Sequence, residues 1–418
     1  MIRLTFITAL LTFGLTPVTR AQVKVAPHYA ALANGYWSAA VQRPDGHGIA
    51  FTFEVKDSAG RQILYIRNAG EHLLVDDIEV NGDSVLIRLP FFESQFRAVL
   101  IREGMLRGTW YKRLTDHYQL MPFTATYGGS RFPSDKTPIA DISGRWAAWF
   151  GDSSRERPEL LVGEFRQQGK HLTGTFLEQT GDYRFLEGVV DGDSMRLSCF
   201  DGSHAYLFTA HIDNDGRISG GQYYAGPTYH QPWMAVRDAN AKLPDEFTLT
   251  KWKKDRSHIQ FSFRDLDGKT VSFSDPRFHD KIVLIQLMGS WCPNCMDETR
   301  FLSKFYDEYH DKGLEIVALA YERSTDFARS RVSVRSFRQR FDVKYPMLIT
   351  GVSVSDSLRA EKTLPQLDAI VGFPTTIFVN RHGDIEKIHT GFNGPGTGEH
   401  YEEQKKEFYK TVDAMLAE

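Results

Sequence analysis

This chain of 418 residues lacks an excess of basic residues. Lys and Arg together number 50, Asp and Glu number 53, and the formal net charge is −3. A protein that binds nucleic acid through its phosphates needs a concentrated surplus of cations. The charge balance therefore excludes a broad basic surface, and we expect no nucleic-acid partner.

Cysteine is also scarce, since the chain holds only Cys199, Cys292 and Cys295. Three cysteines are too few for a scaffold stapled by disulfides. With 41% hydrophobic and 25% charged residues, the composition is that of ordinary globular domains. Two of the three cysteines nevertheless lie three residues apart, a spacing typical of redox pairs.

Long apolar runs are missing after the N-terminus. Residues 1–21 combine Arg3, an apolar stretch over Leu4–Leu15 and a small residue, Ala21, which is the pattern of a cleaved signal peptide. An uncleaved anchor is the alternative, although the stretch is short for a bilayer of about 30 Å. We expect an exported protein, in the periplasm, with no integral membrane segment after cleavage.

Residues 28–237 carry an internal duplication. Gly35–Trp37 recurs as Gly144–Trp146, and Asn81–Ser84 recurs as Asp191–Ser194, at shifts of 109 and 110 residues. Short alternating runs separated by Gly, Asp and Asn predict β-strands in both copies. We expect an antiparallel sandwich or barrel, built either as two tandem copies or as two halves of one larger sandwich.

The duplication also bears on Cys199. A shift of 110 residues places it opposite Leu89, on the apolar face of a strand. We therefore predict a buried, unreactive side chain rather than a reactive thiol. The histidines of this region lack metal-ligand spacing, so no metal site is predicted.

The character of the chain changes after the polar segment Asp238–Glu246. Apolar runs at 281–288 and 314–320 predict buried strands, and they alternate with helices expected at 292–312 and 325–341. The fold class is an α+β multidomain protein whose last domain has a mixed sheet. The expected domains are a signal peptide at 1–21, β-rich repeats at 22–136 and 137–240, and an α/β domain at 241–418.

The helix expected at 325–341 is rich in arginine: Arg329, Arg331, Arg335, Arg338 and Arg340. Such a surface could dock an acidic partner. The interpretation that we favour is a solvated helix face, because charge runs are usually exposed.

The sequence Cys292-Pro293-Asn294-Cys295 follows a predicted buried strand and opens a predicted helix. Unpaired N–H groups and the helix dipole favour an anion at that position, and the thiolate is the reactive form of cysteine. Cys295 returns to the same side of the helix and can resolve a mixed disulfide. The pattern predicts redox chemistry at this pair.

Four stretches carry a family resemblance: Asp265–Val271, Trp291–Cys295, Glu298 and Gly372–Thr376. On them, residues 258–415 resemble the TlpA-like exported thiol–disulfide oxidoreductases of the thioredoxin-like superfamily. The resemblance implies a thioredoxin-like fold. It also implies that Pro374 is cis and packs against the active site, which would leave the backbone of Phe373 free to pair with a substrate strand.

Two positions depart from the family pattern. Arg300 stands where a helix-kinking proline is common, and Gln286 stands where thioredoxins keep a buried acid. Glu298 is therefore the remaining candidate for relaying a proton to Cys295. An exposed helix glutamate is the alternative.

The expected function is thiol–disulfide exchange on proteins, with no cofactor beyond the Cys292–Cys295 disulfide. Partners would be a substrate protein with thiols or a disulfide and an electron donor or acceptor, while the β-rich repeats serve as a recognition platform. Alternatives are a peroxidase, disfavoured by Gly289 in place of a threonine, and a binding protein with a structural disulfide or zinc half-site. The expected catalytic residues are Cys292 and Cys295, supported by Trp291, Pro293, Asn294, Glu298, Phe373 and Pro374.

Overall fold

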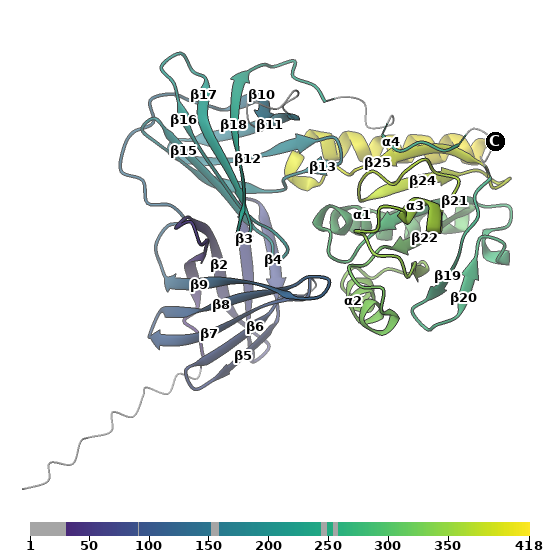
Figure 1. The fold of residues 1–418 in the computed structure, drawn as a ribbon, viewed down its shortest axis with the longest axis horizontal. Helices are drawn as coiled ribbons and strands as arrows, with labels where there is room; N and C mark the ends of the chain where they lie inside the picture. Colours follow the sequence, from purple (N-terminus) through teal and green to yellow (C-terminus); the bar gives the residue numbers. More distant parts are fainter. Residues whose placement is uncertain (1–30, 91, 152–158, 244–248, 254–257) are drawn as a thin grey trace, which may run out of the picture.

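The computed structural model describes residues 31–90, 92–151, 159–243, 249–253 and 258–418 (Figure 1). These residues form three β-sheets, two of nine strands and one of seven. The predicted signal segment, residues 1–21, lies outside the described residues, as do residues 244–246 of the predicted boundary. Among the helices of the described ranges, none has both the length and the apolar character needed to cross a membrane.

The first sheet is antiparallel, in the order β4-β3-β2-β1-β9-β8-β7-β6-β5. Inward positions are apolar at every second residue, as the alternating pattern predicts. The sheet is barrel-like, since β5 returns to β3. Its strands are β1 (Gly35–Gln42), β2 (Gly48–Ser58), β3 (Arg61–Asn68), β4 (Glu71–Val75), β5 (Asp77–Asn81), β6 (Ser84–Arg88), β7 (Ser94–Arg102), β8 (Met105–Arg113) and β9 (Tyr118–Tyr127).

The second sheet has the order β11-β10-β18-β17-β16-β15-β14-β12-β13, and β11 also pairs with β12, which closes a barrel. It pairs β12 with β14, whereas the equivalent β3 and β5 are not neighbours in the first sheet. Its strands are β10 (Gly144–Phe150), β11 (Glu159–Gln168), β12 (His171–Glu178), β13 (Gly181–Asp182), β14 (Leu186–Asp191), β15 (Ser194–Phe200), β16 (Ala205–Ile212), β17 (Ile218–Ala225) and β18 (Tyr229–Arg237).

Equivalent hydrogen bonds mark the duplication. The indole of Trp37 donates to the carbonyl oxygen of Ala33 at 2.9 Å, and that of Trp146 donates to Ile142 at 3.0 Å. Both rings are fully buried. The copies form two tandem sheets, so the alternative of one shared sandwich is wrong. Cys199 is buried and unpaired in the core of the second sheet, which confirms its predicted burial.

The third sheet is mixed, in the order β20-β19-β23-β22-β21-β24-β25, with β21, β22 and β23 parallel and β24 antiparallel to β21. Its strands are β19 (Ser262–Asp265), β20 (Thr270–Ser272), β21 (Ile282–Met288), β22 (Leu314–Ala320), β23 (Met347–Ile349), β24 (Thr375–Val379) and β25 (Ile385–Thr390). The helices are α1 (Pro293–Tyr309), α2 (Phe327–Arg340), α3 (Arg359–Thr363) and α4 (Glu399–Ala417), with short 3-10 turns at Pro276–Phe278, His310–Lys312 and Pro395–Thr397.

Every residue of β21 and β22 is buried, because helices cover both faces of this sheet. On one face Leu284 packs in a cluster with Phe301 of α1 and Phe408 of α4. On the other face Ile285 packs in a cluster with Ala360 of α3. The centre of the sheet is thus rigid on both sides at the point where β21 leads into α1.

The arginine-rich helix contacts the first sheet through Arg329 and Arg340, so the prediction of a solvated face holds only in part, for the exposed Arg335 and Arg338. Arg329 of α2 pairs with Glu93 at 2.7 Å and donates to the carbonyl oxygens of Leu114 and Thr115. Arg340 donates to the carbonyl oxygen of Leu74 at 2.9 Å. The charge pattern could not show this, because the acceptors are mostly backbone carbonyls of strands and loops far away in sequence.

Candidate active site

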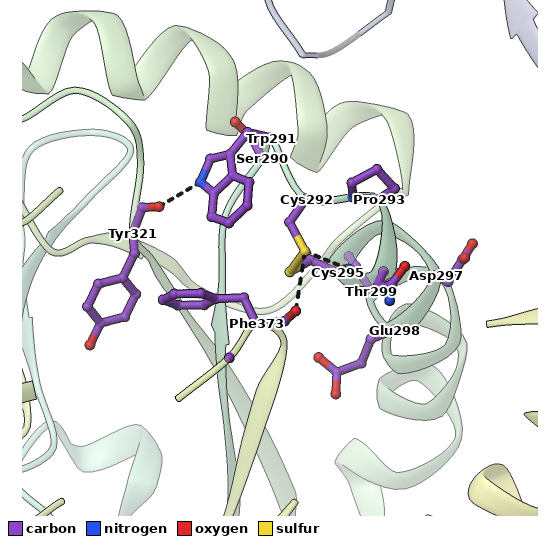
Figure 2. Close-up of a disulfide and its surroundings, with 12 residues drawn as sticks. Ser290, Trp291, Cys292, Pro293, Cys295, Asp297, Glu298, Thr299, Tyr321 and Phe373 are labelled. Atoms are coloured by element: carbon purple, nitrogen blue, oxygen red, sulfur yellow. Dashed lines mark hydrogen bonds between the residues drawn. A yellow bond between two sulfur atoms is a disulfide. The ribbon is translucent and has the colours of Figure 1, made fainter. Parts of the chain in front are cut away.

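The two cysteines of the motif lie where β21 ends and α1 begins (Figure 2). Cys292 is the N-cap of α1, and its Sγ accepts a hydrogen bond from the backbone N–H of Cys295 at 3.2 Å. Pro293 follows at the first helical position, where its missing N–H has no cost. A disulfide joins Cys292 to Cys295 with their Cα atoms 5.2 Å apart. The first turn of α1 therefore directs the N–H group of Cys295 at the sulfur atom of Cys292.

The two sulfurs differ in burial. Cys292 is 5% exposed and Cys295 is fully enclosed at 0%. A partner sulfur can therefore reach Cys292 first. Cys292 Sγ also lies 3.7 Å from the carbonyl oxygen of Phe373, and the Phe373–Pro374 peptide bond is cis, as the family resemblance implies.

Trp291 is held from several sides. Its indole N–H donates to the carbonyl oxygen of Tyr321 at 2.9 Å, and its ring meets Phe373 edge-on at 5.9 Å between centroids. Figure 2 shows the indole above Phe373, beside the disulfide. The guanidinium of Arg323 lies 5.4 Å from the ring centroid. Trp291 is thereby fixed as one wall of the site.

Glu298 is buried beneath the disulfide, so the alternative of an exposed helix glutamate is wrong (Figure 2). Its carboxyl group accepts hydrogen bonds from the Gln286 amide at 2.8 Å and from the Thr376 hydroxyl at 2.7 Å. Burial raises the pKa of Glu298 to about 7, against the opposing effect of these two donors. The carboxyl group can therefore both hold and release a proton near neutral pH.

The second sheet reaches the same motif. The Asn294 amide donates to the carbonyl oxygen of Asp182 at 3.3 Å, and Ser203 Oγ donates to the carbonyl oxygen of Trp291 at 3.0 Å. Arg184 donates to the carbonyl oxygen of Pro293 at 3.0 Å. The β-rich half is therefore part of the surroundings of the cysteines.

Residues 239–405 match the Redoxin family model. Over 134 residues the chain is 30% identical to the thiol-disulfide oxidoreductase ResA of Halalkalibacterium halodurans, covering 32% of this chain and 66% of that relative. It is 29% identical over 131 residues to the thioredoxin-like protein YneN of Bacillus subtilis, covering 31% and 68%.

Residues 239–405 form a thioredoxin-like segment. Among solved structures, a thiol:disulfide interchange protein of the thioredoxin family from Chlorobium tepidum TLS is similar at 18% identity and a TM-score of 0.30, covering 38% of this chain and 95% of that one. The family match begins after the two β-rich sheets.

Four charged residues around the thioredoxin-like segment were missed by sequence reasoning: Glu71, Asp182, Arg184 and Asp297. Arg184 is 3% exposed and forms ion pairs with both Glu71 of the first sheet and Asp297 of α1. Asp182 accepts from the backbone N–H of Gly394 at 2.7 Å, and burial raises its pKa to about 6. These partners are more than 100 residues apart in the chain, so no local pattern could reveal them.

Proposed function

We propose that the protein is a thiol–disulfide oxidoreductase that acts on protein thiols and disulfides through Cys292 and Cys295. The observation that carries this is the placement of Cys292 as the N-cap of α1, with a resolving sulfur bonded to it and Phe373 at its side. A thiolate at a helix N-terminus is stabilised by the N–H groups and the dipole.

In the reducing direction, the Cys292 thiolate attacks one sulfur of a substrate disulfide. A sulfur–sulfur bond forms between Cys292 and the substrate, the substrate disulfide breaks, and the leaving thiolate takes a proton from water. The backbone N–H of Cys295 faces Cys292 Sγ and stabilises the charge that it carries before attack.

Cys295 completes the exchange. Its thiolate attacks Cys292 Sγ, the mixed disulfide breaks, and the second substrate sulfur leaves, so that two electrons have passed to the substrate. Glu298 is the base that we assign to the Cys295 proton, because it is the buried carboxyl group beneath the pair with a pKa of about 7. The same steps in reverse oxidise a substrate dithiol, and an electron donor or acceptor restores the starting form.

The compartment and the domain roles belong to the same proposal. Residues 1–21 act as a signal for export, with the periplasm as the destination, where disulfides persist. Residues 241–418 are the redox domain. The repeats at 22–136 and 137–240 form a platform that controls how substrates meet it.

The test is reduction of insulin disulfides by the purified protein. The Cys292→Ser variant should fall to the rate of dithiothreitol alone, whereas Cys199→Ser should keep full turnover because Cys199 is enclosed in the second sheet. The Cys295→Ala variant should accumulate mixed disulfides on Cys292. Full turnover by Cys292→Ser would refute the proposal, and loss of fold on reducing the pair would favour a structural disulfide.

A further inference from the structure

A short segment of the second sheet lies across the active site. It consists of residues 178–184, from the end of β12 through β13, and is called the cover segment here. Figure 1 shows β13 at the end of the second sheet that points toward the helices of the thioredoxin-like segment. Its contacts fall on three places that border the disulfide.

The first contact is with the motif itself. Gly181 has a φ of +146°, and a Cβ atom added there would overlap the side-chain amide of Asn294. The same amide donates to the carbonyl oxygen of Asp182 at 3.3 Å. A glycine is required for this close approach, so the cover segment packs directly against Asn294, one of the two residues between the cysteines.

The second contact is with the loops beside the cis-proline. A Cβ atom at Gly391 would overlap the backbone of Thr180, and one at Gly372 would overlap its side chain. Gly372 precedes Phe373, whose carbonyl oxygen faces Cys292 Sγ. Thr180 therefore packs against Gly372, next to Phe373, whose backbone is the part of the site that we expect to pair with a substrate chain.

The third contact is a buried ion-pair junction at Arg184. Its guanidinium bonds the carboxylates of Glu71 and Asp297, so it joins the first sheet, the second sheet and α1. Arg184 adopts a φ of +60°, a backbone conformation that residues other than glycine rarely take. Strain and buried charge together show that this junction is held by its surroundings.

We propose that the cover segment determines which substrates reach Cys292, and that Arg184 is the latch that holds it in place. This rests on the proposed function. With the latch closed, the 5% exposed Cys292 admits small thiols past the half-buried Trp291 and Phe373, but excludes a folded protein. Exchange with a protein requires the cover segment to part from α1.

Opening is feasible because the groups of the junction become hydrated together. Removing one charged group of a buried ion pair costs free energy, because the other charge stays buried without compensation. Separation of the cover segment from α1 instead exposes Arg184 and Asp297 to water at the same time. The ion pairs of Arg184 therefore oppose a partial separation of the cover segment from α1. They permit a separation in which Arg184 and Asp297 reach water together.

The test measures access to Cys292 directly and needs no turnover. In a Cys199→Ala and Cys295→Ala background, Cys292 is the only thiol. Its labelling rate by N-ethylmaleimide is compared with that by a long polyethylene-glycol maleimide. With Arg184 intact, the bulky reagent should react far more slowly than the small one. Arg184→Ala should raise the bulky-to-small rate ratio by about tenfold, as local opening becomes more populated.

Arg88→Ala is the matched control, because Arg88 also bridges two carboxylates, Asp77 and Glu79, but on the first sheet alone. It should leave the ratio unchanged. Glu71→Gln weakens the latch from the other side and should raise the ratio too, so the test stands even if Arg184→Ala does not fold.

Equal labelling rates with the latch intact, or a ratio that neither latch variant changes, would overturn the cover segment's role. Neither result bears on the redox proposal, which fails only if Cys292→Ser keeps its activity. A supporting second measurement is turnover. Arg184→Ala should increase insulin reduction more than reduction of glutathione disulfide.

Discussion

The hairpin between the third and fourth strands exists in both copies of the β-rich repeat, and the two versions differ in length. In the first copy, β4 pairs with β3 from Glu71 onward and runs for five residues. In the second copy, β13 pairs with β12 from Gly181 and has only two residues. The shorter strand releases residues 183–185 from the sheet, and Arg184 turns toward α1.

This difference shows how a repeat acquires a second role without new chemistry. The other strands follow one another in the same way in both sheets, and the copies differ where β12 pairs with both β13 and β14. Both hairpins contribute to the same buried junction, because Glu71 of the first copy forms an ion pair with Arg184 of the second copy. The thioredoxin-like segment supplies the sulfurs, while the β-rich copies supply their enclosure.

Arg184→Ala tests the junction and should have the largest effect on stability. Removal of the guanidinium leaves Glu71 with the Asn68 amide and Asp297 with Arg300, but takes away the buried cation that joins the two carboxylates. We expect a loss of about 3–5 kcal/mol in the free energy of unfolding, which is the usual cost of breaking a buried pair. The measurement is urea denaturation followed by circular dichroism.

Arg88→Ala is again the control, because its partners Asp77 and Glu79 are half exposed. Exposed ion pairs contribute little to stability, so Arg88→Ala should leave the urea midpoint almost unchanged. If the two variants lost the same free energy of unfolding, the buried ion pairs of Arg184 would stabilise the fold no more than the exposed ion pairs of Arg88.

Cys292 and Arg184 illustrate what sequence can and cannot predict. The strand at 314–320 and the start of α1 were predicted because each is encoded by neighbouring residues, a continuous apolar run and a Cys-Pro step. Arg184 was missed because its partners Glu71 and Asp297 each lie 113 residues away. The buried position of Glu298 could not be predicted either, because its hydrogen-bond partners Gln286 and Thr376 lie on two strands, β21 and β24.

Burial raises the pKa values of several carboxyl groups around the disulfide, among them Asp297, Glu322 and Glu178. Glu298 and Asp182 represent the two regions in the comparison that follows. Burial raises the pKa of Glu298 in α1 to about 7 and that of Asp182 in the cover segment to about 6. Only Glu298 lies beneath the pair within the thioredoxin-like segment, so we assign the proton transfer to it. Substitutions at the two positions should therefore have different consequences.

Glu298→Gln should slow the attack of Cys295 on a preformed mixed disulfide by about a hundredfold, the ordinary contribution of a general base. In the unsubstituted protein this rate should rise with pH through about 7, as Glu298 loses its proton. The rise should be absent from the variant. Release of the second substrate thiol gives the rate, and an unchanged midpoint in the variant would remove Glu298 from the mechanism.

Asp182→Asn should change the pH dependence of stability and leave the resolution rate intact. The folded pKa of Asp182 is about 6 and its ordinary value is 3.8, so the folded state binds more protons between these pH values. The free energy of unfolding contributed by this group therefore falls as the pH rises through that window, by about 3 kcal/mol. The variant should lack this fall.

The control for Asp182 comes from the other copy. A shift of 110 residues places His72 of β4 at the equivalent position, where it is exposed. His72→Asn should shift the urea midpoint very little at any pH, since surface substitutions usually stay within about 0.5 kcal/mol. If His72→Asn changed the pH dependence of the free energy of unfolding as much as Asp182→Asn does, burial of Asp182 could not be the cause of its effect.

Apart from the control variants, the smallest effect is expected for Cys199→Ala, which tests the equivalence of the two copies away from the junction. Cys199 is fully buried, and its counterpart Leu89 is also buried. Burial raises the pKa of the Cys199 thiol, which keeps it protonated and unreactive. Loss of one sulfur atom from the core should cost about 1 kcal/mol in urea denaturation and leave insulin reduction unchanged, while Leu89→Ala, which removes more apolar volume, should cost more. A loss of redox activity in Cys199→Ala would break the equivalence, because it would give the second copy a chemical role that the first cannot share.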